Sequence, residues 1–200
     1  MFIIGITGGS GAGKSTAVNA LIKLGAKTLD CDEIYHDLLL NCDEMIIEIK
    51  TRFYDVMTDG IIDRKKLGEI VWREPDALLD LNTITHKYIS SEIDRRLNAF
   101  REQGAHTAAI DAIALIESGQ NKKCDNVVGV ITPVEKRISR IMERDGITKE
   151  QAEMRINAQK PDSFYRLNCD FCLENSYDSP EEFEKECSDY FKTFLSGDTP

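Results

Sequence analysis

The residues with the most distinctive chemistry lie near the N-terminus, where segment 8–15 reads GGSGAGKS. Glycines allow successive backbone N–H groups to approach a bound anion and permit the unusual dihedral angles that this approach requires. Lys14 can reach the outer phosphates of a polyphosphate, and the hydroxyl of Ser15 can ligate Mg²⁺. The spacing fits G-x-x-x-x-G-K-[ST], so this segment, here called the phosphate loop, predicts binding of a nucleoside triphosphate.

The flanking segments favour this interpretation over a flexible glycine turn. An apolar strand-like run, Phe2–Ile6, precedes the phosphate loop, and a helical pattern, Ser15–Leu24, follows it and ends at Gly25. A helix that begins at Ser15 directs its positive end toward the phosphates. We therefore expect six residues to bind ATP: Gly11, Ala12, Gly13, Lys14, Ser15 and Thr16.

Two carboxylates follow strand-like segments. Asp32 comes after Ala26–Leu29, which we expect to form a strand beside that of the phosphate loop, where open α/β sheets place ligands. Asp32 could accept the proton of an acceptor hydroxyl, or it could only cap the helix that begins there. Asp111 follows Thr107–Ile110, and it could act either as an outer-shell Mg²⁺ group or as a structural hydrogen-bond acceptor near the phosphate loop.

Arginines gather in a later segment. Arg137, Arg140 and Arg144 are spaced i, i+3 and i+7, so they share one helix face, and Arg155 and Gln159 share a face of the next helix. Two helices with inward arginines suit a lid that closes over phosphates. The alternative is pairing with neighbouring glutamates, which is worth only ~0.3–0.5 kcal/mol a pair.

The charge distribution agrees with a local anion site in an acidic protein. The chain carries a formal net charge of −10, which disfavours a nucleic-acid-binding surface. Residues 133–166 hold eight Lys and Arg against six Asp and Glu, a net charge of +2, whereas residues 167–200 hold two against nine, a net charge of −7. The bases therefore concentrate in one segment, although a solvated helix face would show the same excess.

The elements that must position these residues follow from the pattern of apolar residues. With 200 residues, of which 42% are hydrophobic, the chain fits one globular domain with a sizeable core. Strand-like runs alternate with helical patterns, which predicts an α/β fold with a mostly parallel sheet. Further core strands are expected at 126–131 and 171–173. Helices are expected after Thr132-Pro133, from a capping box of Thr148 and Gln151 to an end at Pro161, and from Ser179. Residues 44–54 and 75–101 are helical with no strong strand between them, and they form a candidate inserted subdomain.

Several classes of protein are disfavoured. No apolar run approaches the ~20 residues of a membrane span, and the start MFIIG lacks the features of a signal peptide, so we expect a cytoplasmic protein with reduced cysteines. The pair Cys169 and Cys172 lacks a second pair or a nearby histidine, which favours ordinary strand packing over a metal site. A GTPase switch needs N-K-x-D after a strand, but residues 121–124 read NKKC and precede one. A small-molecule kinase fits better.

With these residues assembled, the sequence resembles the dephospho-coenzyme A kinase family over nearly the whole chain. The matching motifs, in order, are T-G-G-x-x-x-G-K-S-T at 7–16, D-x-D at 30–32, D-G-x-x-D-R-x-x-L-G-x-x-V at 59–71, L-N-x-I-x-H at 81–86, R-x-x-x-R-D at 140–145, A-x-x-R-I-x-x-Q at 152–159 and D-x-x-x-x-N at 170–175. The central segments at 59–71 and 81–86 are the most specific. Lys87 and Ile113 stand where the family usually has proline, and both lie near the expected substrate side.

The resemblance implies a P-loop NTPase fold, a parallel sheet core flanked by helices, with a helical substrate-binding insertion at about 55–100 and a helical lid at about 133–165. It implies transfer of the ATP γ-phosphoryl group to the 3′-hydroxyl of dephospho-coenzyme A. Mg²⁺ is the expected metal, and Ser15 and Asp111 are its candidate residues. Asp32 would take the hydroxyl proton, while Lys14 and Arg140 would neutralise the transferring group. The other implied roles are ATP binding by Arg144 and by Asn175, which would lie near the adenine, and substrate binding by Asp32, Arg64, His86 and Arg140.

Two alternatives stay open at this point. Another small P-loop kinase, acting on a nucleoside or nucleotide, would keep the phosphate loop and the arginines but would not require the segments at 59–68 and 81–86. A non-catalytic ATP-dependent binding module would bind ATP without phosphoryl transfer. The expected partner is a small-molecule substrate, with no nucleic acid or membrane, and the oligomeric state is left open, a monomer being compatible with the sequence.

Overall fold

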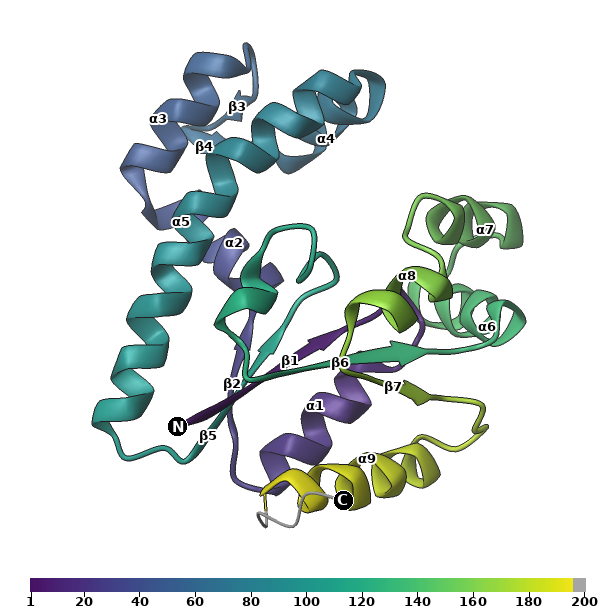
Figure 1. Cartoon of the computed structure of the whole chain (residues 1–200). Coiled ribbons are helices and arrows are strands. Elements are labelled where there is room, and N and C mark those ends of the chain that lie inside the picture. The colour runs from purple at the N-terminus through teal and green to yellow at the C-terminus, as the bar shows by residue number, and fades with distance from the viewer. Residues whose placement is uncertain (196–200) are drawn as a thin grey trace. The chain divides into compact units, whose positions relative to one another are not determined.

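The computed structural model describes residues 1–195, apart from the side chains of Trp72, Pro75 and Phe194. The chain forms two compact units (Figure 1). The first comprises Met1–Leu29 and the described part of Phe100–Pro200, and the second comprises Asp30–Ala99.

A five-stranded sheet forms the centre of the first unit. Its order is β2 (Lys27–Asp30), β5 (Thr107–Asp111), β1 (Phe2–Thr7), β6 (Asn126–Ile131) and β7 (Phe171–Glu174). β1 pairs in parallel with both β5 and β6, and β6 pairs in parallel with β7. The expected α/β fold with a parallel sheet is therefore confirmed.

The expected position of the second strand is wrong. We expected it beside the strand of the phosphate loop, but β5 lies between β2 and β1. The chain leaves β1, skips one place in the sheet to form β2, and fills that place only after passing through residues 31–106. Such a crossover depends on pairing between distant segments, which the local pattern of residues does not encode.

The helices of the first unit bury their apolar faces. α1 (Lys14–Lys23) packs against α9 (Pro180–Leu195), as Figure 1 shows. The aromatic rings of Phe183 and Phe191 on α9 are fully buried in the same cluster as Ala17 and Ala20 of α1, whose small side chains let the two helices approach closely. This packing holds α1, and with it the end of the phosphate loop.

Three further helices follow β6. They are α6 (Val134–Asp145), α7 (Lys149–Asn157) and α8 (Asp162–Asn168), and a short 3₁₀ turn, η1 (Gln120–Lys123), precedes β6. The capping box of Thr148 and Gln151 is confirmed, and α6 and α7 share a small apolar cluster that includes Ile141 and Ile156. α8 was not expected, because Pro161 was interpreted only as the end of a helix, whereas it also precedes the first residue of the next one.

The second unit is mainly helical. It contains α2 (Cys31–Asn41), α3 (Asp43–Arg52), α4 (Arg64–Arg73) and most of α5 (Pro75–Glu102), together with the short antiparallel strands β3 (Met57–Thr58) and β4 (Ile61–Ile62). α2 to α5 and β4 bury a common apolar cluster that includes Leu39, Met45, Ile49, Phe53, Ile62 and Leu81.

The hairpin and α4 refine the sequence interpretation of residues 55–75. Asp59 and Gly60, between the two strands, both have positive φ, of 50° and 84°, which is the backbone of a tight hairpin turn. Asp63 then caps α4 by accepting hydrogen bonds from the backbone N–H groups of Lys65 and Lys66. The D-G-x-x-D motif therefore encodes a turn followed by a helix cap.

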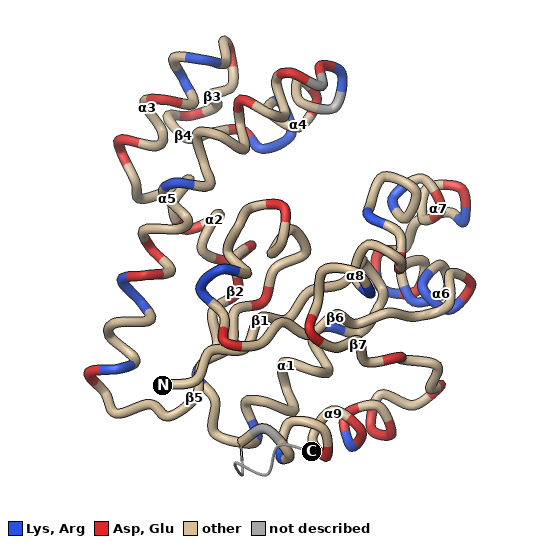
Figure 2. Tube along the Cα trace, viewed as in Figure 1, with Lys and Arg blue, Asp and Glu red and all other residues tan. Residues whose placement is uncertain are grey.

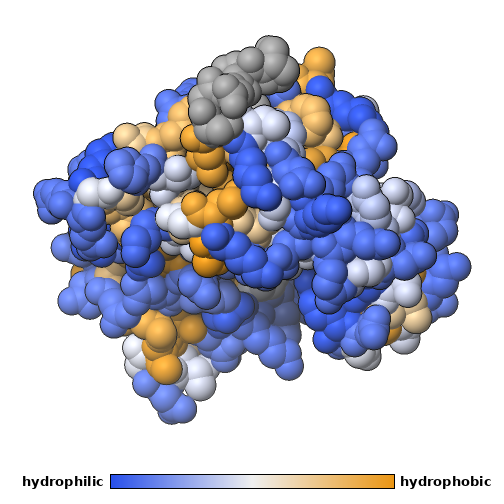
Figure 3. Space-filling model, turned by 90° about the horizontal axis from the view of Figure 1, so that it is seen from below, coloured by the Kyte–Doolittle hydropathy of each residue, from blue (hydrophilic) through white to orange (hydrophobic). Residues whose placement is uncertain are grey.

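One face of the molecule is largely polar (Figure 3). On the face drawn in Figure 3, hydrophilic residues predominate and hydrophobic residues form small separate groups. Among the helices of residues 1–195, none combines the length and the apolar character that crossing a membrane would require.

Candidate active site

The phosphate loop connects β1 to α1 through a backbone that only glycine can adopt at its two ends. Gly8 has φ 141° and Gly13 has φ 103°. A Cβ on Gly8 would lie 2.3 Å from the carbonyl oxygen of Val130, and a Cβ on Gly13 would lie 2.4 Å from Nδ2 of Asn175. Both conformation and space therefore require glycine at these positions.

Side chains from three segments hold the carbonyl groups of the phosphate loop. The Ser10 carbonyl accepts a hydrogen bond from Nε of Arg137 at 2.9 Å. The Ala12 carbonyl accepts one from Thr132 Oγ1 at 2.8 Å and one from Asn175 Nδ2 at 2.9 Å. The C=O and N–H of one trans peptide point in opposite directions. The N–H groups of the following residues, Gly11 and Gly13, therefore point away from these anchoring side chains.

The start of α1 adds further donors. The helix begins at Lys14, one residue earlier than expected, and no side chain caps it at Gly13. The first backbone N–H groups of a helix have no intrahelical partner and carry the positive end of the helix dipole. Together with the N–H groups of Gly11 and Gly13, they are the kind of donors that binding of a polyphosphate would require.

Asn175 supports the loop from directly beyond β7. Its side chain is buried, at 3% exposed, and its Oδ1 accepts a hydrogen bond from Nη2 of Arg140 at 3.3 Å. Arg140 also donates to the carbonyl groups of Gly11 at 3.3 Å and Tyr177 at 2.8 Å. The structure thus brings Arg140 and Asn175 together against the phosphate loop, while the expected contact of Asn175 with adenine stays a prediction.

The arginines of the α6–α7 segment form two groups that differ in their hydrogen-bond partners. Arg137 and Arg140 reach backbone carbonyls of the phosphate loop, whereas Arg144 pairs with Asp145 through two hydrogen bonds of 2.7 and 2.9 Å. Arg155 pairs with the same carboxylate, and these two arginines hold the pKa of Asp145 at about 2. Figure 2 shows the basic residues along α6 and α7. Binding of ATP by Arg144 stays a prediction.

Asp111 ends β5 beside the strand that leads into the phosphate loop. It pairs in register with Ile6, two residues before Gly8. The next segment is anchored to β1, because the buried hydroxyl of Thr7 donates to the carbonyl of Ile113 at 3.0 Å. Proline at position 113 would offer the same carbonyl, so this contact does not depend on the departure from the family pattern.

The structure corrects one interpretation of Asp32, which lies in the second unit. The residue that caps α2 is Asp30, whose Oδ1 accepts hydrogen bonds from the backbone N–H groups of Asp32 at 2.7 Å and Glu33 at 3.2 Å. Asp32 lies in the first turn of the helix with an exposed side chain. The helix-cap reading of Asp32 is therefore wrong, and its carboxylate is available for another role.

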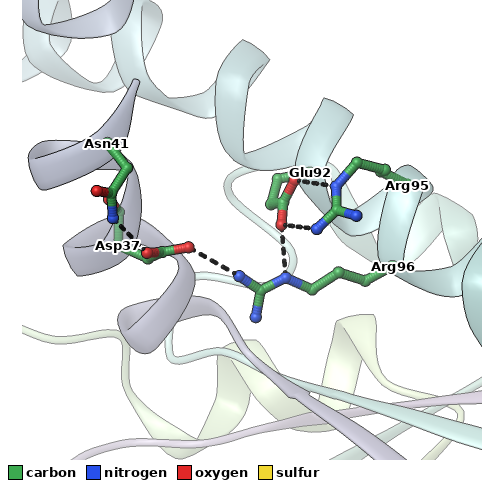
Figure 4. Close-up of polar contacts among 5 residues, drawn as sticks. All are labelled: Asp37, Asn41, Glu92, Arg95 and Arg96. Atoms are coloured by element: carbon green, nitrogen blue, oxygen red, sulfur yellow. Dashed lines mark hydrogen bonds and ion pairs between the residues drawn. The ribbon is translucent and has the colours of Figure 1, made fainter. Parts of the chain in front are cut away.

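A chain of ion pairs fixes α2 to α5 (Figure 4). Arg96 donates from Nε to Glu92 Oε1 at 2.6 Å and from Nη2 to Asp37 Oδ2 at 3.1 Å. Asn41 donates to the other oxygen of Asp37 at 2.7 Å. Arg95 binds both oxygens of Glu92 but does not reach α2, and Arg95 and Arg96 hold the pKa of Glu92 at about 2. Only Arg96 therefore connects the two helices within this group.

The two other expected substrate residues, Arg64 and His86, also lie in the second unit. Arg64 begins α4 directly after the cap residue Asp63. His86 lies on α5, where partial burial lowers its pKa and favours the neutral ring. The structure thus places Asp32, Arg64 and His86 in one unit, and it places the phosphate loop in the other.

The departure at position 87 has a local role. Lys87 binds both carboxylate oxygens of Glu48 on α3, at 2.7 and 2.6 Å. The hydroxyl of Tyr88 donates to the same carboxylate at 2.6 Å, which raises the pKa of Tyr88 to about 12. Lys87 therefore connects α5 to α3 through an ion pair. A proline at this position would form no such pair and would lack the backbone N–H that donates within α5.

Comparison with known proteins identifies the family to which this arrangement belongs. A family model described as dephospho-CoA kinase matches residues 2–181 of the 200. The chain belongs to the dephospho-CoA kinase family. It is therefore a phosphotransferase that acts on an alcohol group, in coenzyme A biosynthesis. The family match favours this reading over the other kinases and the non-catalytic module that the sequence left open.

Individual relatives agree with the family match. The dephospho-CoA kinase of Dehalococcoides mccartyi is 39% identical over 82% of this chain and 83% of its own length. That of Corynebacterium glutamicum is 33% identical over 98% of both chains. Among solved structures, dephospho-CoA kinase from Campylobacter jejuni has a TM-score of 0.71 at 26% identity, covering 98% of both chains. A shikimate kinase from Acinetobacter baumannii, at 18% identity and a TM-score of 0.58 over 100% of this chain and 96% of its own, shares the fold alone.

Proposed function

We propose that the chain transfers the γ-phosphoryl group of ATP to the 3′-hydroxyl of dephospho-coenzyme A, giving coenzyme A and ADP. The observation that carries this proposal is the anchoring of the Ser10 and Ala12 carbonyls by Arg137, Thr132 and Asn175. This anchoring turns N–H groups to the side where a triphosphate would bind. Phosphoryl transfer depends mainly on such positioning and on neutralisation of charge.

Lys14 and Arg140 are the proposed cationic groups. Lys14 is the first residue of α1, and Arg140 lies against Gly11, so both side chains belong to elements that contact the phosphate loop. Ser15 and Asp111 are the proposed magnesium-binding residues. Their hydroxyl and carboxylate oxygens fit the preference of Mg²⁺, which neutralises charge on the β- and γ-phosphates when bound.

Asp32 is the proposed acceptor of the hydroxyl proton. Support comes from its exposed carboxylate in the first turn of α2 and from the assignment of the cap to Asp30. The second unit would hold the rest of dephospho-coenzyme A, with Arg64 as a cation for its phosphates and neutral His86 as a hydrogen-bonding group. Arg144 and Asn175 complete the proposed ATP site. A cytosolic location agrees with six free cysteines, and the oligomeric state stays open.

An acceptor panel tests the reaction. ADP release would be measured with dephospho-coenzyme A, AMP, CMP and uridine, each with ATP and Mg²⁺. We expect turnover with dephospho-coenzyme A and little with the others. Turnover that required a nucleoside or nucleotide acceptor would contradict the proposal.

The role of Asp32 has a matched control in Glu33, an exposed carboxylate in the same turn of α2. Asp32→Asn should lower kcat about 10²–10⁴-fold with ATP binding retained, as expected for loss of a general base. Glu33→Gln removes the same charge near the same helix end and should leave kcat within about twofold. Equal effects of both substitutions would mean that charge near α2, and not proton transfer, limits the reaction.

A further inference from the structure

Arg137 is a buried cation with an unusual environment. The residue is only 3% exposed, and within residues 1–195 no carboxylate forms an ion pair with it. Burial lowers its pKa, and the charge of Asp162 opposes this at longer range. Arginine nevertheless stays protonated in proteins. Buried charges are normally paired, because a charge removed from water without a counter-charge is costly.

The hydrogen bonds of Arg137 give its N–H groups acceptors but supply no negative charge. Nε donates to the Ser10 carbonyl at 2.9 Å, and Nη2 donates to Oε1 of Gln159 at 2.9 Å. The same Gln159 oxygen accepts from the Ser10 backbone N–H at 2.9 Å, and Gln159 Nε2 donates to Ser10 Oγ at 2.7 Å. Both hydrogen-bond acceptors of Arg137 are therefore neutral. Arg137, Gln159 and Ser10 form a closed network of hydrogen bonds.

The second glycine of the phosphate loop makes room for this guanidinium group. A Cβ on Gly9 would lie 2.1 Å from Nη2 and 2.7 Å from Cζ of Arg137. The loop backbone at Gly9 is thus in direct contact with the buried charge. Since the Ser10 N–H is already bonded to Gln159, the phosphate-binding donors begin at Gly11, immediately beyond this contact.

We propose that Arg137 is a positioning residue of the ATP site, whose buried charge is compensated by the triphosphate in the phosphate loop and thereby favours ATP over less charged nucleotides. The proposal rests on the proposed function only in requiring that the loop binds ATP. In an environment with little water, a unit charge acts over several ångströms, so Arg137 can stabilise the anion without touching it. Through Gln159 and Ser10 it also couples the α6–α7 segment to the loop.

The stability of the ligand-free protein distinguishes a structural role of Arg137 from a role of its charge. If Arg137 only held the loop in place, its replacement would lower the melting temperature and affect all nucleotides alike. If its charge awaits an anion, Arg137→Gln should leave the melting temperature of the ligand-free protein unchanged or raise it, because an uncompensated buried charge is removed. The ATP-induced rise in melting temperature should then become smaller.

The test measures dissociation constants of ATP, ADP, AMP and inorganic tripolyphosphate by calorimetry, without an acceptor, together with melting temperatures. For Arg137→Gln we expect binding of ATP and tripolyphosphate to weaken about 10- to 100-fold, ADP less and AMP least. Arg137→Lys, which keeps the charge, should restore most of the affinity for ATP. The control Lys149→Gln removes one exposed charge from α7 and should change none of these constants by more than about twofold.

The outcomes separate the ideas clearly. Loss of folding by Arg137→Gln, equal weakening of ATP and AMP, or failure of lysine to restore binding would each overturn the role of the charge. Absence of ATP binding by the unsubstituted protein would instead overturn the proposed function. Because the assay contains no acceptor, a wrong assignment of dephospho-coenzyme A would leave this test unaffected.

Discussion

The carbonyl of Ala12 offers a quantitative test of how the phosphate loop is held. It accepts hydrogen bonds from Thr132 at 2.8 Å and Asn175 at 2.9 Å, and all three residues are buried. Thr132→Val or Asn175→Leu alone removes one donor and leaves the other. Each substitution should therefore lower the free energy of unfolding by only about 1–2 kcal/mol.

The double variant should be worse than the sum of its parts. With both donors gone, the Ala12 carbonyl is buried without a partner, which adds a penalty of about 1–3 kcal/mol. For a chain of this length each kcal/mol lowers the melting temperature by about 2–4 °C. Affinity for ATP should fall in the same non-additive way, because the N–H of Gly13 turns with the freed peptide.

Urea denaturation of the four proteins in this cycle provides the measurement. A second cycle serves as control: Thr85→Val removes a buried hydroxyl that donates to the Leu81 carbonyl at 2.8 Å and shares no partner with Asn175. Thr85→Val and Asn175→Leu should be additive within about 0.5 kcal/mol. The same additivity for Thr132→Val with Asn175→Leu would refute the idea that these two side chains together fix the loop.

Three other predictions concern the ion pairs and the metal. Arg96→Ala should lower kcat about 3- to 10-fold at unchanged KM for ATP, because Arg96 holds α2, which carries Asp32. Arg95→Ala should leave kcat unchanged, because Arg95 does not reach α2. Equal effects of the two substitutions in steady-state kinetics would contradict this. The pKa of Glu92 is lowered from 4.5 to about 2, so its stabilising contribution is present above pH 4.5 and lost as the pH falls toward 2; Glu92→Gln should flatten the fall in urea midpoint over this range, and an unchanged slope would count against it. Removal of Mg²⁺ with a chelator should abolish ADP release and excess Mg²⁺ should restore it; turnover without divalent ions would exclude the roles given to Ser15 and Asp111.

Features that depend on neighbouring residues were predictable from the sequence. The phosphate loop follows from residue type and spacing, and the capping box at Thr148 and Gln151 follows in the same way. The hairpin at Asp59-Gly60 also had a local signal, since this dipeptide favours a tight turn, but the strands are only two residues long and too short for a periodic pattern.

Ambiguous local signals and contacts between distant residues were not predictable. Asp30 and Asp32 carry the same group two positions apart, and only the backbone at Asp30 decides which one caps α2. The helical spacing of Arg137 and Arg140 indicated a shared face, but not that Ser10 and Gln159 would surround Arg137. A glycine at position 9 was the one available signal, because it leaves space for a group from elsewhere in the fold.

The last described helix, α9, supports the phosphate loop with a residue that lies beyond the family match. The family match ends at residue 181, yet Phe183 lies beyond it and its ring would be 3.4 Å from a Cβ on Gly13. Synthesis on the ribosome produces the nucleotide-binding turn first and this supporting ring some 170 residues later, at about 5–20 residues per second. A nascent chain that has not yet reached Phe183 would thus carry the complete motif without this supporting ring, and we expect it to bind ATP only after Phe183 has been added.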